Sequence, residues 1–326
     1  MTPPALEVRD LVVSAGDHHR RWRVVDGVSF SVDAGQSVGI VGESGCGKSL
    51  TLRAIMALTP DPIAIDSGTV LLSGEELPLR GRRVRATRRG HMSMVFQDPL
   101  SSLDPVHSAG AQVAEIARRV RGLPRRAAWT RAVDLLGLVG IREPQRRAHD
   151  YPHQLSGGMR QRVMIAMALA SEPQVLLCDE PTTALDVTVQ AQVLDLLNNL
   201  RVQLRLALVF VSHDLAVVSS ICERVAVMYA GRFVETGPTL EVLRRPRHPY
   251  TLGLRQAVVD AEAVGRLPRA IRGELPDPSA RPAGCPFHPR CDFADDACVQ
   301  GPVELSAIGV DDRSVACLHS ELVPAP

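Results

Sequence analysis

The sequence predicts an α/β fold: a mixed, mainly parallel sheet with a phosphate-binding loop, a helical insertion and a small cysteine-rich C-terminal extension. Short apolar runs alternate with helical patterns, and a glycine-rich loop ending in lysine follows one of these runs. Four of the seven cysteines lie after residue 284. The chain has 326 residues, 45% of them apolar, which suffices for two domains, or for one large domain with an appendage.

Four short apolar runs predict buried strands of a mainly parallel sheet: Ser37–Gly42, Met92–Phe96, Val175–Cys178 and Ala207–Ser212. The segment VAVMYAGRFVETG predicts a hairpin that turns at Ala230–Gly231. The second and third runs are separated by a stretch with helical patterning and no clear strand. We therefore expect a helical subdomain over about residues 98–164.

Composition and charge exclude several classes of protein. The formal net charge is +1, whereas a protein that binds nucleic acid through its charge has a clear basic excess. The arginine run Arg80–Arg89 is therefore interpreted as a solvated loop or helix face rather than a patch for nucleic acid or lipid headgroups. The N-terminus has no pattern of a secretory signal, and no apolar run is long enough to span a bilayer, so we expect a cytoplasmic chain.

The segment GESGCGKS, Gly42–Ser49, fits the phosphate-loop pattern G-x-x-x-x-G-K-[ST]. Glycines allow the backbone N–H groups to surround a phosphate, and the helix that follows adds the positive end of its dipole. We expect Lys48 to reach the terminal phosphates and Ser49 to bind Mg²⁺. A strand before the loop and a helix after it argue against a chance match. The residues predicted to bind nucleotide here are Gly42, Glu43, Ser44, Gly45, Cys46, Gly47, Lys48, Ser49 and Leu50.

Two adjacent acids end the apolar run VLLCDEP. Asp179 is predicted to hold the Mg²⁺ shell, and Glu180 to orient or deprotonate a water that attacks the γ-phosphate. Asp179 alone would be equally consistent with a helix N-cap. Two acids at the end of a strand, in a chain with a phosphate loop, favour the role in nucleotide hydrolysis.

A second anion site is predicted at LSGGMRQRV, where Ser156, Gly157 and Gly158 open a long helix. One chain needs only one phosphate loop. The second helix N-terminus has a role if it binds the phosphate of a nucleotide held by another subunit and so completes that subunit's site.

With these motifs the chain resembles the ATP-binding subunits of ABC transporters, over about Leu6 to Thr239. GESGCGKS resembles Walker A, VLLCDE resembles Walker B and LSGGMRQR resembles the family signature. Gln97 in VFQDP matches the Q-loop glutamine, TALD (Thr183–Asp186) the D-loop and His213 in FVSHD the switch histidine. The resemblance implies an ABC ATPase domain over residues 1–239 and a head-to-tail dimer of ATPase subunits with two ATP molecules between them.

The resemblance also implies roles for single residues. The catalytic set is Glu180, His213 and Gln97, of which His213 holds the γ-phosphate and positions the water, and Gln97 senses the γ-phosphate. Gln97, Ser49 and Asp179 are the implied protein ligands of Mg²⁺. Family members stack adenine on an aromatic residue near the position of Ala15, which this chain lacks, so Trp22 or a histidine is left as the alternative.

Three segments resemble one branch of the family, the ATPase subunits of dipeptide, oligopeptide and nickel importers: Phe96–Pro105, Arg247–Leu254 and Ile271–Cys291. This implies a C-terminal extension over residues 240–326, two membrane permeases, a second related ATPase, an extracytoplasmic substrate-binding protein and a place on the cytoplasmic face of the membrane. Peptide is the expected solute and nickel the alternative. ABC ATPases that act on nucleic acid or ribosomes form a distant alternative, because they commonly have two cassettes or a long coiled coil.

The extension contains Cys285, Cys291, Cys298 and Cys317. Their spacings lack the C-x2–4-C pairs of structural zinc sites, and four thiolates also suit a [4Fe–4S] cluster. Some of the ATPases that the chain resembles hold such a cluster there. We expect the cluster, with zinc as the second interpretation and free thiols as the third. Because the ATPase core has its own sheet, we expect ATP binding to be largely independent of this tail.

Overall fold

The computed structural model describes residues 2–16, 20–79, 88, 90–183, 185–257, 270–309 and 312–324. The chain forms two compact units that alternate along the sequence. The first comprises residues 1–6, 32–36 and 72–209, and the second comprises residues 7–31, 37–71 and 210–326. The last of the boundaries along the chain falls within strand β8 (Ala207–Ser212).

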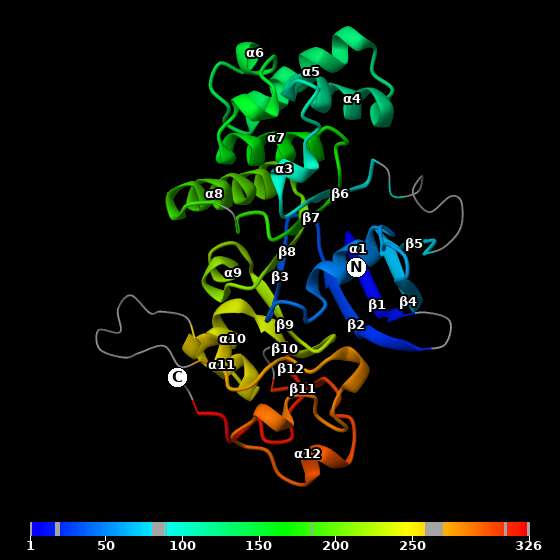
Figure 1. The fold of residues 1–326 in the computed structure, drawn as a ribbon, viewed down its shortest axis with the longest axis vertical. Helices are drawn as coiled ribbons and strands as arrows, with labels where there is room; N and C mark the ends of the chain where they lie inside the picture. Colours follow the sequence, from blue (N-terminus) through cyan, green and yellow to red (C-terminus); the bar gives the residue numbers. More distant parts are fainter. Residues whose placement is uncertain are drawn as a thin grey trace. The chain divides into compact units, whose positions relative to one another are not determined.

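The first unit is mainly helical. Residues 98–164 are all described and contain helices but no strand, as the sequence predicts. Helix α4 packs against α5, and both contact α7 (Figure 1). The helices of the unit are α3 (Pro99–Ser102), α4 (Ala109–Arg121), α5 (Arg125–Leu138), α6 (Pro144–Arg147), the 3-10 turn η1 (Pro152–Gln154), α7 (Gly157–Leu169) and α8 (Val187–Leu204).

The strands of the first unit include two of the predicted apolar runs. Strands β6 (Met92–Val95) and β7 (Val175–Asp179) pair in parallel, and all residues of β7 are buried. A short third strand is β5 (Glu75–Leu77). Burial on both faces explains why β7 is a continuous apolar run rather than an alternating one.

The second unit contains the predicted strand β3 (Ser37–Val41), which pairs in parallel with β9 (Arg224–Tyr229). Its sheet continues in the order β11-β12-β10-β9-β3. Three further strands of this unit are neighbours in the order β2-β1-β4, and the sequence analysis did not single them out: β1 (Leu6–Gly16), β2 (Arg21–Val32) and β4 (Ala64–Leu72).

The predicted hairpin joins β9 to β10 (Arg232–Pro238) and turns at Ala230–Gly231. Both turn residues have positive φ, 45° and 82°, as a two-residue type I′ turn requires. The hairpin is thus confirmed at the predicted position.

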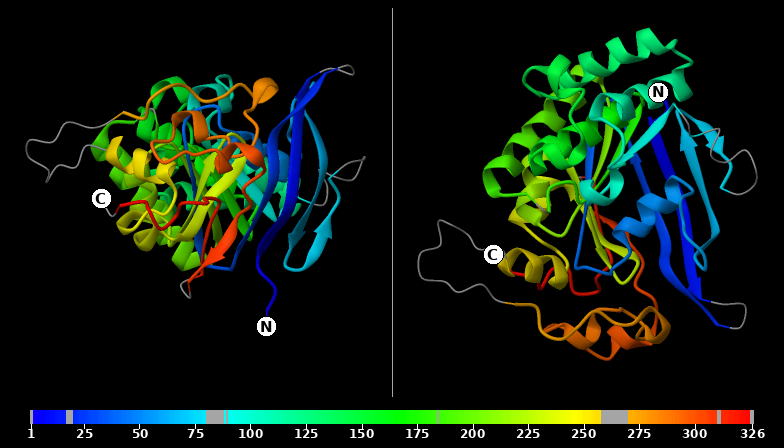
Figure 2. Two further views of the ribbon diagram at one scale, coloured as in Figure 1. Left: turned by 90° about the horizontal axis from the view of Figure 1, so that it is seen from below. Right: turned by 45° about the horizontal axis from the view of Figure 1, so that its top comes forward.

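The C-terminal extension adds strands to this sheet. Strand β12 (Arg313–Val315) pairs antiparallel with β10, and β11 (Ser306–Ile308) pairs with β12. The segment over residues 285–298 lies against the start of α11 (Figures 1 and 2). The helical elements of the second unit are α1 (Lys48–Ile55), α9 (Leu215–Ile221), α10 (Thr239–Arg244), α11 (Pro249–Ala257), η2 (Pro278–Ala280), η3 (His288–Arg290) and α12 (Ala297–Gln300).

Within the described part of the chain, every helix is too short or too polar to cross a bilayer. The arginine run lies outside the described residues except for Arg88, whose side chain is buried and donates from Nη1 to the carbonyl oxygen of Pro78 (2.6 Å). At this position the interpretation as a solvated face is wrong. The helical pattern beyond Ala257 also lies outside the described residues.

Candidate nucleotide site and cysteine cluster

The phosphate loop connects β3 to α1 in the second unit. A Cβ atom on Gly42 would lie 2.2 Å from the carbonyl oxygen of Met228, so only glycine fits this close approach. Gly47 precedes α1 with φ 113°, a conformation that favours glycine. Lys48 is buried, and its Nζ donates to the carbonyl oxygens of Gly42 (2.8 Å) and Glu43 (3.0 Å). The loop therefore has the backbone form and the buried cation that phosphate binding requires.

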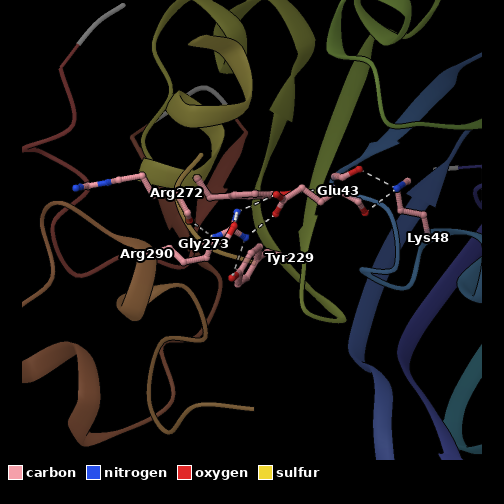
Figure 3. Close-up of polar contacts among 8 residues, drawn as sticks. Glu43, Lys48, Tyr229, Arg272, Gly273 and Arg290 are labelled. Carbon is pink, nitrogen blue, oxygen red and sulfur yellow. Dashed lines mark hydrogen bonds and ion pairs between the residues drawn. The ribbon is translucent and has the colours of Figure 1, made fainter. Parts of the chain in front are cut away.

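Residues of the extension contact this loop directly (Figure 3). The Arg290 guanidinium donates to both carboxylate oxygens of Glu43, at 2.7 and 2.9 Å. The backbone N–H of Glu43 donates to the Tyr250 hydroxyl (2.8 Å). The hydrogen bonds to Glu43 raise the pKa of Arg290 above its ordinary value. Nothing in the sequence analysis linked Tyr250 or Arg290 to the nucleotide site, although both lie in segments that it noted.

The acidic pair lies in the first unit at the end of β7. Asp179 is buried, and Glu180 adopts positive φ (46°). The Gln97 side chain donates from Nε2 to Glu180 Oε2 (3.3 Å), and the Thr183 hydroxyl donates to the same oxygen (3.0 Å). The structure thus brings together two of the three predicted catalytic residues. The sequence analysis placed Thr183 in the D-loop segment but did not predict that its hydroxyl contacts Glu180.

The signature segment opens helix α7, also in the first unit. Ser156 is the N-cap, and its Oγ accepts from the backbone N–H of Met159 (3.3 Å). Ser156 and Gly157 are exposed, and Gly158 is half-buried. This N-terminus therefore faces solvent on its own chain.

His213 and Trp22 belong to the second unit. His213 is exposed and follows β8, and the next residue, Asp214, caps α9 by accepting from Ala216 N (2.8 Å). Trp22 is half-buried on β2, and Ala15 is half-buried on β1. No described contact joins Trp22 or Ala15 to the phosphate loop, so the residue that stacks on adenine stays a prediction.

The four cysteines of the extension line one small cavity. Phe287, His248 and His319 are among the residues that complete its wall. Burial raises the pKa of Cys285 and Cys291, and it raises the pKa of Cys317 to about 11.

A smaller group overlaps this cavity. Ligand atoms of Asp295, Cys298 and His319 lie within 4.8 Å of one another. The Asp295 carboxylate contacts His319 Nε2 at 3.1 Å. The other three cysteines, Cys46 in the phosphate loop, Cys178 at the end of β7 and Cys222 after α9, are buried.

Comparison with known proteins agrees with this arrangement. Residues 25–183 match the family model described as "ABC transporter", and residues 234–298 match the one described as "Oligopeptide/dipeptide transporter, C-terminal region". The oligopeptide transport ATP-binding protein OppD of Bacillus subtilis is 45% identical over 292 residues, which cover 89% of this chain and 82% of that protein. The chain belongs to the ATP-binding subunits of ABC transporters.

Further comparisons place this ABC subunit in the oligopeptide and dipeptide branch. The dipeptide transport ATP-binding protein DppD of Haemophilus influenzae is 42% identical over 319 residues, which cover 97% of this chain and 96% of that protein. The solved structure of the dimeric, post-hydrolysis ATP-binding cassette MJ0796, bound to ADP and Pi, is 28% identical with a TM-score of 0.63 and covers 72% of this chain and 98% of that one. The fold of this subunit is thus that of an ABC ATPase.

Proposed function

We propose that this ABC subunit hydrolyses ATP to drive the import of dipeptides or oligopeptides. The observation that carries the proposal is that both parts of the chain match: the ATPase part matches the ABC transporter model, and residues 234–298 match the C-terminal region of oligopeptide and dipeptide transporters. Relatives that align over most of the chain are named for transport of these solutes. The same role in an importer of nickel or another small solute is the alternative, because an ATPase subunit does not touch the solute.

The hydrolytic step is assigned to residues of this chain and its partner. Lys48 and the phosphate-loop amides hold the phosphates of ATP, and His213 holds the γ-phosphate. Glu180 orients the attacking water and accepts its proton as the bond between the β- and γ-phosphates breaks, which releases ADP and phosphate. The contacts of Gln97 and Thr183 with Glu180 Oε2 support this role, because they fix the orientation of the carboxylate.

The residues assigned to Mg²⁺ fit a hard cation. Ser49, Asp179 and Gln97 offer hydroxyl, carboxylate and amide oxygens, which are the donors that Mg²⁺ prefers. When bound, Mg²⁺ neutralises negative charge on the phosphates.

The assembly follows from the same assignment. Ser156, Gly157 and Gly158 would complete the site of a second ATPase subunit in a head-to-tail dimer, which is supported by the exposed N-terminus of α7. The proposed partners are a related ATPase, two permeases and an extracytoplasmic binding protein, with this subunit peripheral on the cytoplasmic face of the membrane. Nucleic acid is not among them, because the net charge is only +1.

The test is ATP hydrolysis by the complex reconstituted with its permeases and partner ATPase. Peptide-loaded binding protein should stimulate hydrolysis, and nickel-loaded protein should not. Glu180→Gln in this chain should lower kcat by about 10²–10⁴-fold, the usual contribution of a general base, while ATP binding is kept. Wild-type turnover by Glu180→Gln would contradict the role of Glu180, and stimulation by nickel alone would favour the alternative.

We further propose that Cys285, Cys291, Cys298 and Cys317 hold one [4Fe–4S] cluster. The cavity that they share supports this. When bound, a cluster cross-links four points of an extension that has little core of its own.

Metal analysis of the chain purified without oxygen tests this site. About four irons per chain are expected, with loss of iron and of the brown colour in Cys285→Ser. The matched control is His319→Ala, which should keep the iron. Stoichiometric zinc that is lost in His319→Ala but kept in Cys285→Ser would instead assign the metal to Asp295, Cys298 and His319.

A further inference from the structure

One arginine of the extension is held firmly beside the phosphate loop. The Arg290 side chain is only 5% exposed and makes a bidentate ion pair with Glu43. Its guanidinium carbon lies 5.7 Å from the Tyr229 ring centroid and 5.8 Å from that of Phe287. It also donates to the carbonyl oxygens of Arg272 (2.7 Å) and Gly273 (3.2 Å) (Figure 3). A planar guanidinium that is stacked and hydrogen-bonded in this way has little freedom to move.

Glu43 is in turn fixed by its backbone as well as by its side chain. Its N–H donates to the hydroxyl of Tyr250, a fully buried side chain, and its carbonyl oxygen accepts from Lys48 Nζ. Glu43 thus has three partners: Arg290 and Tyr250 of the extension, and Lys48 of the phosphate loop. The position of Glu43 and the position of Lys48 are therefore linked.

The position of Glu43 affects nucleotide binding because its side chain is negatively charged. A carboxylate in a loop that binds a polyanion repels the phosphates, and it also attracts the lysine that should contact them. Arg290 neutralises the Glu43 carboxylate and holds it on the side of the loop where the extension lies (Figure 3). An uncharged residue at position 43 would not need an arginine to neutralise it.

We propose that Arg290 is a positioning residue for nucleotide binding, which holds Glu43 away from the phosphates and so makes ATP affinity depend on the folded C-terminal extension. The inference rests on the proposed function, since it concerns how the ATP site is formed. Arg290 directly precedes Cys291, and Phe287, which stacks on Arg290, lines the cysteine cavity. Order in the cysteine site is thereby transmitted to the phosphate loop over a short, buried path.

The test is the affinity of the full-length chain for a non-hydrolysed ATP analogue, measured by calorimetry. Arg290→Met should raise Kd about tenfold, because one uncompensated charge remains near the phosphates. The double variant Glu43→Gln/Arg290→Met should restore Kd to within about threefold of wild type, since the charge is then gone. Glu43→Gln alone should bind at least as tightly as wild type. In the assembled complex, Arg290→Met should raise KM for ATP and leave kcat largely unchanged.

The matched control is Arg224→Met. Arg224 also joins the sheet to the extension, through an ion pair with Asp312 (2.7 Å), but at a place with no described contact to the phosphate loop. Its substitution should leave Kd unchanged. Should Arg290→Met give no folded protein, Arg290→Lys takes its place: it keeps the charge but loses the bidentate geometry, and amide hydrogen exchange of residues 42–48 should become faster.

The outcomes separate this inference from the proposed function. Wild-type Kd in Arg290→Met, an equally weak double variant, or unchanged exchange in Arg290→Lys would overturn the positioning role. Lys48→Ala serves as the reference for loss of binding. If the wild-type chain bound the analogue no better than Lys48→Ala, the proposed ATP site itself would be wrong.

Discussion

Asp26 shows how one buried carboxylate joins distant parts of the second unit. Its side chain is 6% exposed and accepts hydrogen bonds from Arg23 (3.0 Å), Arg232 (2.7 Å) and Arg281 (2.9 Å). Burial by itself would raise the pKa of Asp26, but the hydrogen bonds and charges of the arginines outweigh burial and hold the pKa below its ordinary value. Strand β2, strand β10 and the extension thus share one anion.

We expect Asp26→Asn to lower the free energy of unfolding by about 2 kcal/mol at pH 7, because it removes a buried, charged acceptor of hydrogen bonds from three arginines. A carboxyl group whose pKa is lowered by folding stabilises the fold above its unfolded pKa, and the stabilisation is lost as the pH falls through the folded value. The difference between wild type and variant should therefore shrink below about pH 4. Urea unfolding of both proteins at pH 7, 5 and 3 measures this difference in the free energy of unfolding. Asp312→Asn, at an exposed pair, should cost less than about 0.5 kcal/mol, and an Asp26 effect that persists unchanged at pH 3 would contradict the argument.

At the scale of elements, burial decides which strands the sequence could predict. Strands β3, β7 and β8 are buried at every position, so each is a continuous apolar run that stands out from its surroundings. Strands β1 and β2 mix buried and exposed residues without strict alternation, and β2 carries several charges. Their pattern fits neither an apolar run nor an alternating strand, which is why the sequence analysis missed them.

Helix α7 allows a prediction about its N-terminus. Ser156→Arg should leave ATP binding at the phosphate loop of the same chain intact, because the two belong to different segments with separate roles. It should impair hydrolysis at the site that α7 completes in the partner subunit, since a large side chain blocks access to the helix N-terminus.

Photo-crosslinking of a labelled nucleotide to each subunit measures ATP binding at the two sites, and ATP turnover by the complex measures hydrolysis. Ser156→Ala is the control, as it removes the cap at a cost of about 1 kcal/mol without filling the space. Equal loss of ATP binding at both sites would argue against a head-to-tail dimer.

For the whole molecule, local motifs were predictable and long-range pairings were not. The phosphate loop, the acids at Asp179 and Glu180 and the signature each occupy a few consecutive residues with a chemical reason for their spacing. Glu43 meets Tyr250 and Arg290 across 207 and 247 residues of sequence, and no local pattern signals such contacts. These contacts count against the expectation that ATP binding is largely independent of the tail, because the tail holds the phosphate loop in place.

The distance along the chain between Glu43 and Arg290 has a consequence for biosynthesis. At about 5–20 residues per second, the ribosome needs roughly 12 to 50 s to add the 247 residues that separate them. During that time the phosphate loop has left the ribosome without the arginine that neutralises it. A nascent or prematurely terminated subunit therefore binds ATP more weakly than the finished chain, and full affinity is reached only when synthesis is nearly complete.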